Sequence, residues 1–514
     1  MTGFNVVDYA VFVTYIVASV VIGVWFVREQ RSVKDYFLAG QSMNWFVVAI
    51  SVIAALFSGI SYLGAPTEVY NNDMTYAVSL LSFFIATPVT AVVFLPFFYR
   101  LNLYSAYEYL EKRFDIQVRL WSSAMFILRV IFYLALAIYA PALAVAEVTG
   151  LRWEISVALI GGLTTLYTAL GGMKAVIWTD VMQFFVLLGG MVLVGWVAMT
   201  RIPGGVVGTF DIAYGAGKLN FANFDFSLTA RVTFWGALIG GVFSSLVQMA
   251  TDQISVQRYL TAKSLPEAKK SLWFKLIVTL PIVVLFYAMG AVLYAFYQVH
   301  PDHTLADLDK PDRIMPHFVV SQLPHGFPGV LIAALFAATM STVSSGINAL
   351  STASIMDFYK RMINPEVGEE RLFRLSRALT VCFGALAIGV AFLMPLLGTL
   401  VEATNKIMGM LGGPLLGVFL LGMLSRRVNS SGALLGAFFG SIALAYVVFA
   451  TKVSFMWYAA FGCLGTMAFG YLFSFATGRV PREKIEGLVF SWSMARTAEE
   501  EEAKTAPDDE AGEQ

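Results

Sequence analysis

Residues 51–66 read SVIAALFSGISYLGAP, an apolar stretch whose middle carries serines and glycines where leucines would be expected. Similar apolar blocks of about 20 residues, the length that crosses a bilayer core of about 30 Å, recur along the chain. The 514 residues are 58% hydrophobic and 13% charged, whereas an average soluble domain has roughly 25% charged residues. This composition excludes a soluble enzyme, a secreted disulfide scaffold and a disordered protein. It predicts an all-α polytopic membrane protein.

The apolar blocks predict thirteen transmembrane helices. They lie near 7–27, 45–66, 75–98, 120–148, 155–171, 180–200, 232–250, 274–298, 327–356, 377–397, 404–424, 432–451 and 455–477. The positive charges of the first block follow the apolar run, so we expect a retained span and not a signal peptide. Lys and Arg are concentrated in every second connection, including Arg258 and Lys263. This bias predicts an outside N-terminus and a cytoplasmic C-terminus in the cell (plasma or inner) membrane.

The charges balance, with 34 Lys and Arg against 34 Asp and Glu. No basic field therefore favours a nucleic-acid partner, and the lipid bilayer is the expected surrounding partner. All four histidines fall between residues 300 and 325, outside the apolar blocks, which argues against a histidine proton relay. We expect a transmembrane domain over residues 1–480 and an acidic, disordered tail over 481–514.

Two spans contain residues that favour interruption of a helix. The second span carries Ser58, Gly59 and Ser61 at its middle, and the seventh contains Gly236, Gly240, Gly241, Ser244, Ser245 and Gln248. Broken helices in corresponding positions of two halves mark the binding site of many transporters. Close packing of helices through small residues is the alternative explanation.

The ninth span carries the densest polar cluster, with five hydroxyl groups between residues 339 and 345. On a helix, Ala338, Ser341, Thr342 and Ser345 share one face. Na⁺ is a hard cation that prefers oxygen ligands, so hydroxyls beside unwound carbonyls suit it. The alternative is that the hydroxyls bond carbonyls one turn earlier in their own helix.

Two charged residues lie within or beside apolar blocks. Asp180 opens the sixth span, where it either caps the helix or provides a second cation ligand beside the hydroxyl cluster. Arg129 lies inside the fourth span, and we expect it to extend to the cytoplasmic face; the alternative is a pairing with an anionic substrate.

Five separated motifs occur in order between residues 8 and 477. They are DYFLAG (35–40), SAYEYL (105–110), GGMKAVIWTDVMQ (171–183), DQISVQRY (252–259) and AATMSTVSS (337–345). Together they resemble the sodium:solute symporter family, which contains sodium/glucose, sodium/proline, sodium/sialic acid and sodium/iodide transporters. The resemblance implies a leucine-transporter-like core of two five-helix inverted repeats, about 45–200 and 232–424, with flanking helices and alternating access driven by Na⁺.

The resemblance also implies which residues bind sodium. The main site uses backbone carbonyls of Ala54, Phe57 and Ala338 with the hydroxyls of Ser341 and Thr342. Family members with a second sodium use the residues that match Asp180, Ser341, Ser344 and Ser345. All of these are present, and the number of sodium ions stays open.

The segment 139–150 resembles the branch for iodide, monocarboxylates and vitamins, which indicates a small organic anion as the imported solute. The candidate substrate contacts, beside the two expected breaks, are Ser58, Ser61, Tyr62 and Gln248. The alternatives are a sugar or amino acid symporter, proton coupling, a transporter-like sensor and a membrane-embedded enzyme. A sensor would need a signalling domain, and no span contains a catalytic metal motif or a Ser-His pair.

Overall fold

Helices account for the regular structure in the part of the chain that the computed structural model describes, residues 4–25, 32–101, 103–221, 223–307, 311–397 and 399–491. The first half contains α1 (Val6–Trp25), α2 (Val33–Leu38), α3 (Trp45–Leu56), α4 (Gly59–Asn71), η3 (Met74–Ser82), α5 (Phe83–Val89), η4 (Thr90–Phe94), α6 (Leu95–Arg100), α7 (Glu108–Arg113), α8 (Ile116–Thr149), α9 (Trp153–Thr200) and α10 (Gly205–Gly215). The second half contains η5 (Gly236–Gly240), α11 (Gly241–Leu246), η6 (Val247–Thr251), α12 (Gln253–Tyr259), α13 (Leu265–Val299), α14 (Ile314–Gln322), α15 (Phe327–Ala353), η9 (Ser354–Ile363), α16 (Glu369–Ala391), α17 (Leu400–Ile407), η11 (Met408–Gly412), α18 (Gly413–Leu424), α19 (Ser430–Ala450) and α20 (Tyr458–Ala476).

The described helices confirm a multi-pass arrangement. Nine helices are long and apolar enough to cross a membrane, and the bent pair α3–α4 makes ten. Three shorter apolar helices, Val6–Ile22, Trp153–Leu166 and Gly236–Thr251, lie where the first, fifth and seventh spans are predicted. The total of thirteen spans and the two inverted repeats remain predictions.

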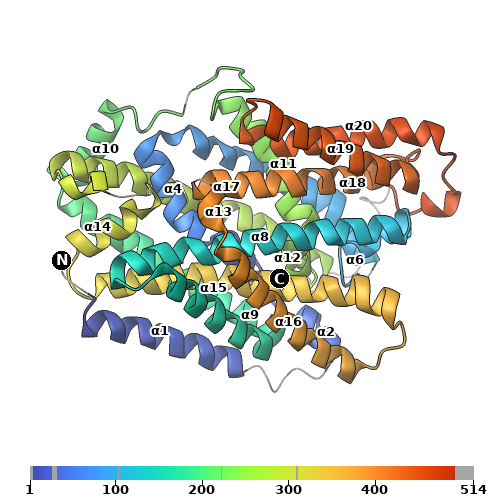
Figure 1. Ribbon diagram of the computed structural model, residues 1–514, viewed down its shortest axis with the longest axis horizontal. Coiled ribbons are helices and arrows are strands. Elements are labelled where there is room, and N and C mark those ends of the chain that lie inside the picture. Colours follow the sequence, from blue (N-terminus) through green and yellow to red (C-terminus); the bar gives the residue numbers. More distant parts are fainter. Residues whose placement is uncertain are drawn as a thin grey trace, which may run out of the picture.

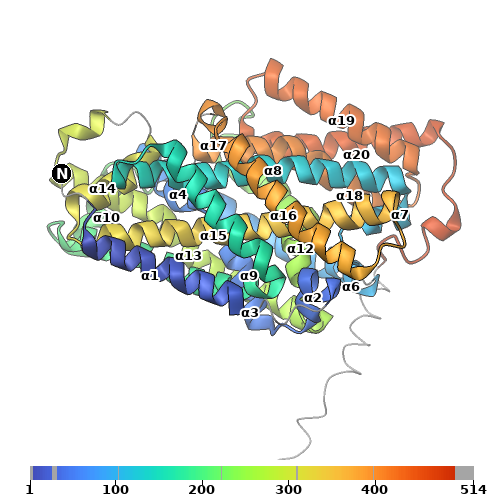
Figure 2. The same ribbon diagram turned by 60° about the horizontal axis from the view of Figure 1, so that its bottom comes forward.

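The polar ninth span lies at the centre of the bundle. The most apolar part of the helix that continues from α15 into η9 is 94% buried, and α15 packs against α1, α8, α9 and α16. Figures 1 and 2 show α15 running beside α1 and α9. Its hydroxyls are therefore shielded from lipid, whereas apolar side chains such as Phe438 and Phe449 on α19 are exposed. Exposed apolar side chains carry no penalty in hydrocarbon, so this inside-out distribution fits a membrane protein.

Backbone interruptions divide several of these helices. Gly172 within α9 has φ 58° and ψ −167°, a conformation that L side chains rarely adopt, and it separates the fifth span from the sixth. The seventh span is built from two π-helical segments, η5 and η6, on either side of α11. It therefore does not break at its glycines; the chain becomes extended at Asp252, after the span.

The end of the chain departs from the expectation of a disordered tail from residue 481. The Tyr109 hydroxyl donates to the Leu488 carbonyl at 2.8 Å, and the Phe490 N–H donates to the Met423 carbonyl at 2.7 Å. Leu488 and Val489 are buried. Two hydrogen bonds and two buried side chains thus hold residues 488–490 against the bundle, and the acidic remainder, 492–514, lies outside the described residues.

Candidate functional site

The second span is broken at the residues that the sequence indicates. Helix α3 ends at Leu56, α4 begins at Gly59, and the two helices are bent by 58°. Phe57 (φ −90°, ψ 103°) and Ser58 (φ −101°, ψ 171°) are extended. A helix leaves its last carbonyl groups without intrahelical partners. The break therefore presents backbone oxygens inside the bundle.

Hydroxyl groups of α15 meet these oxygens. Ser341 Oγ donates to the carbonyls of Ala54 and Ala338, both at 3.0 Å, and Thr342 Oγ1 donates to Ala338 O at 3.1 Å. Four residues of the predicted main sodium site are thus linked by hydrogen bonds, and Phe57 lies at the break itself. This set of carbonyl and hydroxyl oxygens is the donor chemistry that a hard monovalent cation requires.

The sequence predicts that Asp180 opens the sixth span, but in the structure Asp180 lies inside a helix. Because the second half of α9 starts at Gly172, Asp180 lies about two turns inside it. Its Oδ2 accepts hydrogen bonds from Ser51 Oγ at 2.5 Å and from Arg258 Nη2 at 3.0 Å, while Oδ1 has no partner among the described residues. Arg258 also donates to Ser345 Oγ. The predicted second cation site therefore contains a buried arginine.

The remaining hydroxyls of that predicted site lie close by. Ser344 Oγ donates to the Ser341 carbonyl at 3.2 Å, and Ser345 Oγ donates to the same carbonyl. Arg258 was expected in a cytoplasmic loop, but its side chain is 1% exposed. Its partner Asp180 is 78 residues away in sequence, so no local pattern reveals the pair.

A cavity of about 220 Å³ adjoins the break in the second span. Three of the four predicted substrate contacts, Ser58, Ser61 and Gln248, line this cavity. Tyr62 does not; its ring packs edge-on against Phe286 at 5.6 Å between centroids. Polar lining residues that the sequence analysis did not propose are Tyr76, Ser79, Tyr133, Ser244, Ser245, Tyr287, Thr404 and Asn405. They come from several spans, so only the folded chain brings them together.

A smaller cavity continues from the first and shares Leu56, Tyr133, Gln248 and Met408 with it. Thr342 and Lys275 also line the smaller cavity. Lys275 is 2% exposed, and within the described residues its ammonium group has no ion pair. Its recorded contact is with the Phe83 ring, 5.6 Å from the centroid. A buried lysine without an ion pair among the described residues therefore lies beside the cavity, in a lining that also contains Asp252 and Arg258.

Arg129 is buried inside the bundle and is paired with an acidic residue. Its guanidinium is fully buried and forms an ion pair with Asp252, Nη2 to Oδ2, at 2.7 Å. Asp252 also caps α12, because its Oδ1 accepts from the Ile254 N–H at 3.0 Å. The expectation that Arg129 extends to the cytoplasmic face is wrong, because a buried aspartate satisfies its charge.

Ion pairs join the helices at one end of the cavity. Arg231, from the segment before η5, binds Glu68 of α4 through two contacts of 2.6 and 2.8 Å and Glu402 of α17 at 3.3 Å. The hydrogen bonds to Glu68 raise the pKa of the Arg231 guanidinium above its ordinary value. Asn405 and Tyr76 also join, Nδ2 to hydroxyl, at 2.7 Å. We call the Arg231–Glu68–Glu402 group the Arg231 clamp.

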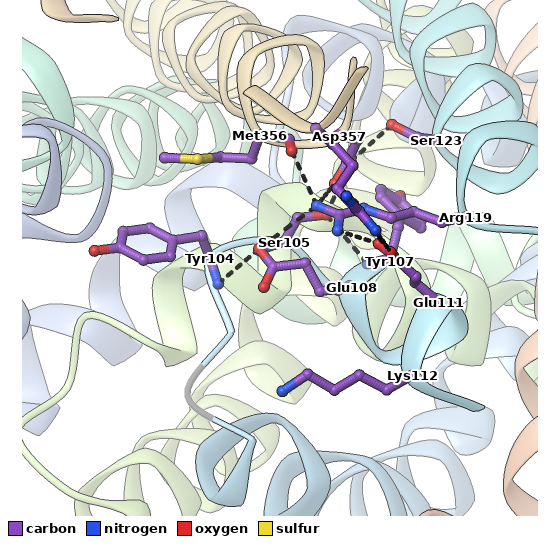
Figure 3. A network of polar contacts seen from close by, with 12 residues as sticks. Tyr104, Ser105, Tyr107, Glu108, Glu111, Lys112, Arg119, Ser123, Met356 and Asp357 are labelled. Carbon is purple, nitrogen blue, oxygen red and sulfur yellow. Dashed lines mark hydrogen bonds and ion pairs between the residues drawn. The ribbon is translucent and has the colours of Figure 1, made fainter. Parts of the chain in front are cut away.

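A second network joins helices where η9 follows the C-terminal end of α15 (Figure 3). Arg119 of α8 binds Asp357 of η9 at 2.6 Å and Glu111 of α7 at 2.7 Å. Ser105 and Ser123 donate to the other Asp357 oxygen at 3.0 and 2.8 Å. Movement of α15 relative to α8 would have to break these contacts.

A broken span, a facing hydroxyl-rich helix, a central cavity and ion-pair networks that join the surrounding helices are together typical of a helical membrane transport protein. The profile of the sodium:solute symporter family matches residues 36–440. The chain belongs to this family, so it is a sodium-coupled transporter and not an enzyme.

Individual relatives cover most of the chain. Sodium-coupled monocarboxylate transporter 1 of Homo sapiens is 38% identical over 442 residues, 85% of this chain and 72% of that protein. The sodium/sialic acid symporter NanT of Aliivibrio fischeri is 35% identical over 474 residues, 91% of this chain and 93% of that protein. The structure of a Na⁺-coupled sialic acid symporter in a substrate-bound outward-open state superposes with a TM-score of 0.88 at 29% identity, covering 93% of this chain and 99% of that one.

Proposed function

We propose that this protein is a sodium-coupled symporter that imports a small organic anion, with monocarboxylates as the favoured class. The observation that carries the proposal is the buried, unpaired Lys275 beside a cavity that adjoins the broken span. An unpaired buried cation is costly, and an anionic ligand would offset that cost. The names of the monocarboxylate and sialic acid relatives agree, since both describe organic acids.

The main sodium ion binds between the break and α15. Carbonyls of Ala54, Phe57 and Ala338 and hydroxyls of Ser341 and Thr342 replace its hydration shell. In the described geometry the Ser341 hydroxyl donates to the Ala54 carbonyl. When Na⁺ binds, that hydroxyl rotates, so that both oxygens face the ion. Sodium thereby stabilises the arrangement in which the two spans are in contact, and shifts the conformational population toward it.

The second sodium site, formed by Asp180, Ser341, Ser344 and Ser345, needs a rearrangement. Arg258 pairs with Asp180 in the described geometry, and separating a buried ion pair costs several kcal/mol. We propose that a second ion binds only in a state in which Arg258 has moved away. Such a protein would show a sodium Hill coefficient above one.

The substrate binds in the cavity, with its anionic group toward Lys275. Ser58, Ser61 and Gln248 supply hydroxyl and amide groups around it, and Tyr62 supports the broken span from behind. Each positive charge that moves inward gains about 2.3 kcal/mol per 100 mV of membrane potential. A monovalent anion therefore enters against an inside-negative potential when two sodium ions accompany it, and electroneutrally with one.

Alternating access requires the two clamping networks to open in turn. We propose that the Arg231 clamp faces the outside and the Arg119–Asp357 network faces the cytoplasm, in a thirteen-span arrangement with two inverted repeats. The N-terminus then lies outside and the C-terminus lies inside the cell membrane. This orientation follows the bias of exposed Lys and Arg toward alternate connections.

Counterflow in proteoliposomes tests the proposal. Lactate, nicotinate, sialic acid, biotin, glucose and proline are compared at fixed pH with Na⁺ or K⁺. We expect Na⁺-dependent exchange of the carboxylic acids. Lys275→Met should abolish it, whereas Lys263→Met, which changes an exposed lysine before the same helix, should not. Na⁺-dependent exchange of glucose or proline alone, or anion exchange retained by Lys275→Met, would contradict the proposal.

A further inference from the structure

Three arginines from distant parts of the sequence converge at residues 482–490, the segment that packs against α7 and α18. Arg426 and Arg482 line an open cavity of about 290 Å³ together with Glu486 and Gly487. Arg100, at the end of α6, approaches the same loop, with Nη2 3.3 Å from the position of a Cβ on Gly487. All three arginines are exposed, and within the described residues none of them forms an ion pair.

The wall of this cavity is held in place by the folded chain. Lys484 Nζ donates to the Glu111 carbonyl at 3.1 Å, on α7. The contacts of Tyr109 with Leu488 and of Phe490 with Met423 hold the following residues. The arginines are therefore presented on a fixed surface, although they come from three segments.

Exposed apolar side chains lie beside the basic surface. Leu424, two residues before Arg426, is 54% exposed, and Leu472 and Phe475 near the end of α20 are 62% and 56% exposed. The Arg427 guanidinium lies over the Phe475 ring, 3.7 Å from its centroid. Because α18 and α20 end here, the charged cavity lies where membrane-crossing helices leave the hydrocarbon. Positive charge directly above an apolar surface is the pattern that an anionic phospholipid complements.

We propose that this cavity binds the headgroup of an anionic glycerophospholipid. The phosphate contacts the guanidinium groups of Arg426 and Arg482, and the acyl chains lie along Leu424, Leu472 and Phe475. Guanidinium groups suit this role, because they bind phosphate oxygens through paired N–H donors. Glu486 is the one acidic side chain that lines the cavity, so the arginines leave the lining with a net positive charge.

Lipid retention by the full-length protein, purified in a mild detergent and followed by native mass spectrometry, tests this site. The probes are phosphatidylglycerol, phosphatidylcholine and phosphatidylethanolamine. We expect selective retention of phosphatidylglycerol. One basic residue near a membrane surface changes anionic-lipid affinity by about fivefold, so Arg426→Gln/Arg482→Gln should lower retention by about 25-fold and Arg482→Gln alone by about fivefold.

Arg371→Gln is the matched control, because Arg371 is an exposed arginine at the start of α16 that forms no ion pair with the described residues. It should retain phosphatidylglycerol as the parent does. Equal losses in the control, or parent-like retention in a variant that elutes as a folded protein, would overturn the proposal. So would equal retention of the three lipids. A thermal shift with inorganic phosphate that the double variant removes, without lipid retention, would assign the cavity to a free anion instead.

Discussion

Replacement of Ser341 by alanine tests whether its hydroxyl binds sodium or only stabilises the fold. The Ser341 hydroxyl joins α15 to the break in the second span through the Ala54 carbonyl at 3.0 Å. An interaction of a polar group with a charge contributes about 1.5–3 kcal/mol. Its loss should therefore raise the sodium concentration for half-maximal uptake by about 10- to 150-fold. The neutral hydrogen bonds lost with it are worth about 1 kcal/mol of folding stability.

The assay is the initial rate of uptake in proteoliposomes as a function of Na⁺, with choline keeping the ionic strength constant. Ser351→Ala is a matched control: Ser351 is buried on the same helix and donates to a carbonyl of another helix, that of Ser376, also at 3.0 Å. We expect both variants to lose similar thermal stability and only Ser341→Ala to lose sodium affinity. An unchanged half-maximal sodium concentration in folded Ser341→Ala would refute the site.

Two further substitutions probe the buried pair and the helix packing. Asp180→Asn leaves Arg258 buried without a counter-charge, so we expect a loss of about 3–5 kcal/mol of stability; a parent-like thermal midpoint in detergent would show that the pair is not intact. Gly290→Ala should lower the midpoint through about 1–3 kcal/mol of overpacking, because a Cβ there would overlap the Pro66 carbonyl. Gly162→Ala meets no neighbour and should leave the midpoint unchanged; equal effects at both glycines would argue against the α4–α13 contact.

The break in the second span and the hydroxyl-rich face of the ninth could be predicted because local sequence encodes them. Ser58 and Gly59 weaken the helix where leucine would support it, and the hydroxyls of the ninth span recur on one helical face. The contact between them needed the family resemblance, since 287 residues separate Ala54 from Ser341.

Errors arose where a distant partner decides the environment of a charge. Arg258 follows an apolar run, and a count of loop charges therefore assigns it to the cytoplasm. In the folded chain α12 returns into the bundle, where Gln257 bonds Phe37 and Asn348 and Arg258 meets Asp180. Arg129 was misplaced for the same reason, since Asp252 is its partner.

The π-helical turns of the seventh span make its length as important as its composition. A π turn holds one residue more than an α turn, and η6 places Gln248 on the cavity just before the chain becomes extended at Asp252. Deletion of a single residue from 247–251 would let the segment rewind as α-helix. Because the π turn absorbs this extra residue locally, the residues after it would keep their orientation, and Asp252 would still face Arg129. A deletion within the α-helical part of the span would instead rotate everything after it by about 100°. A relative with an ordinary α-helix here would have one residue fewer. An alignment without a one-residue gap at 247–251 would then match the wrong faces of the two helices.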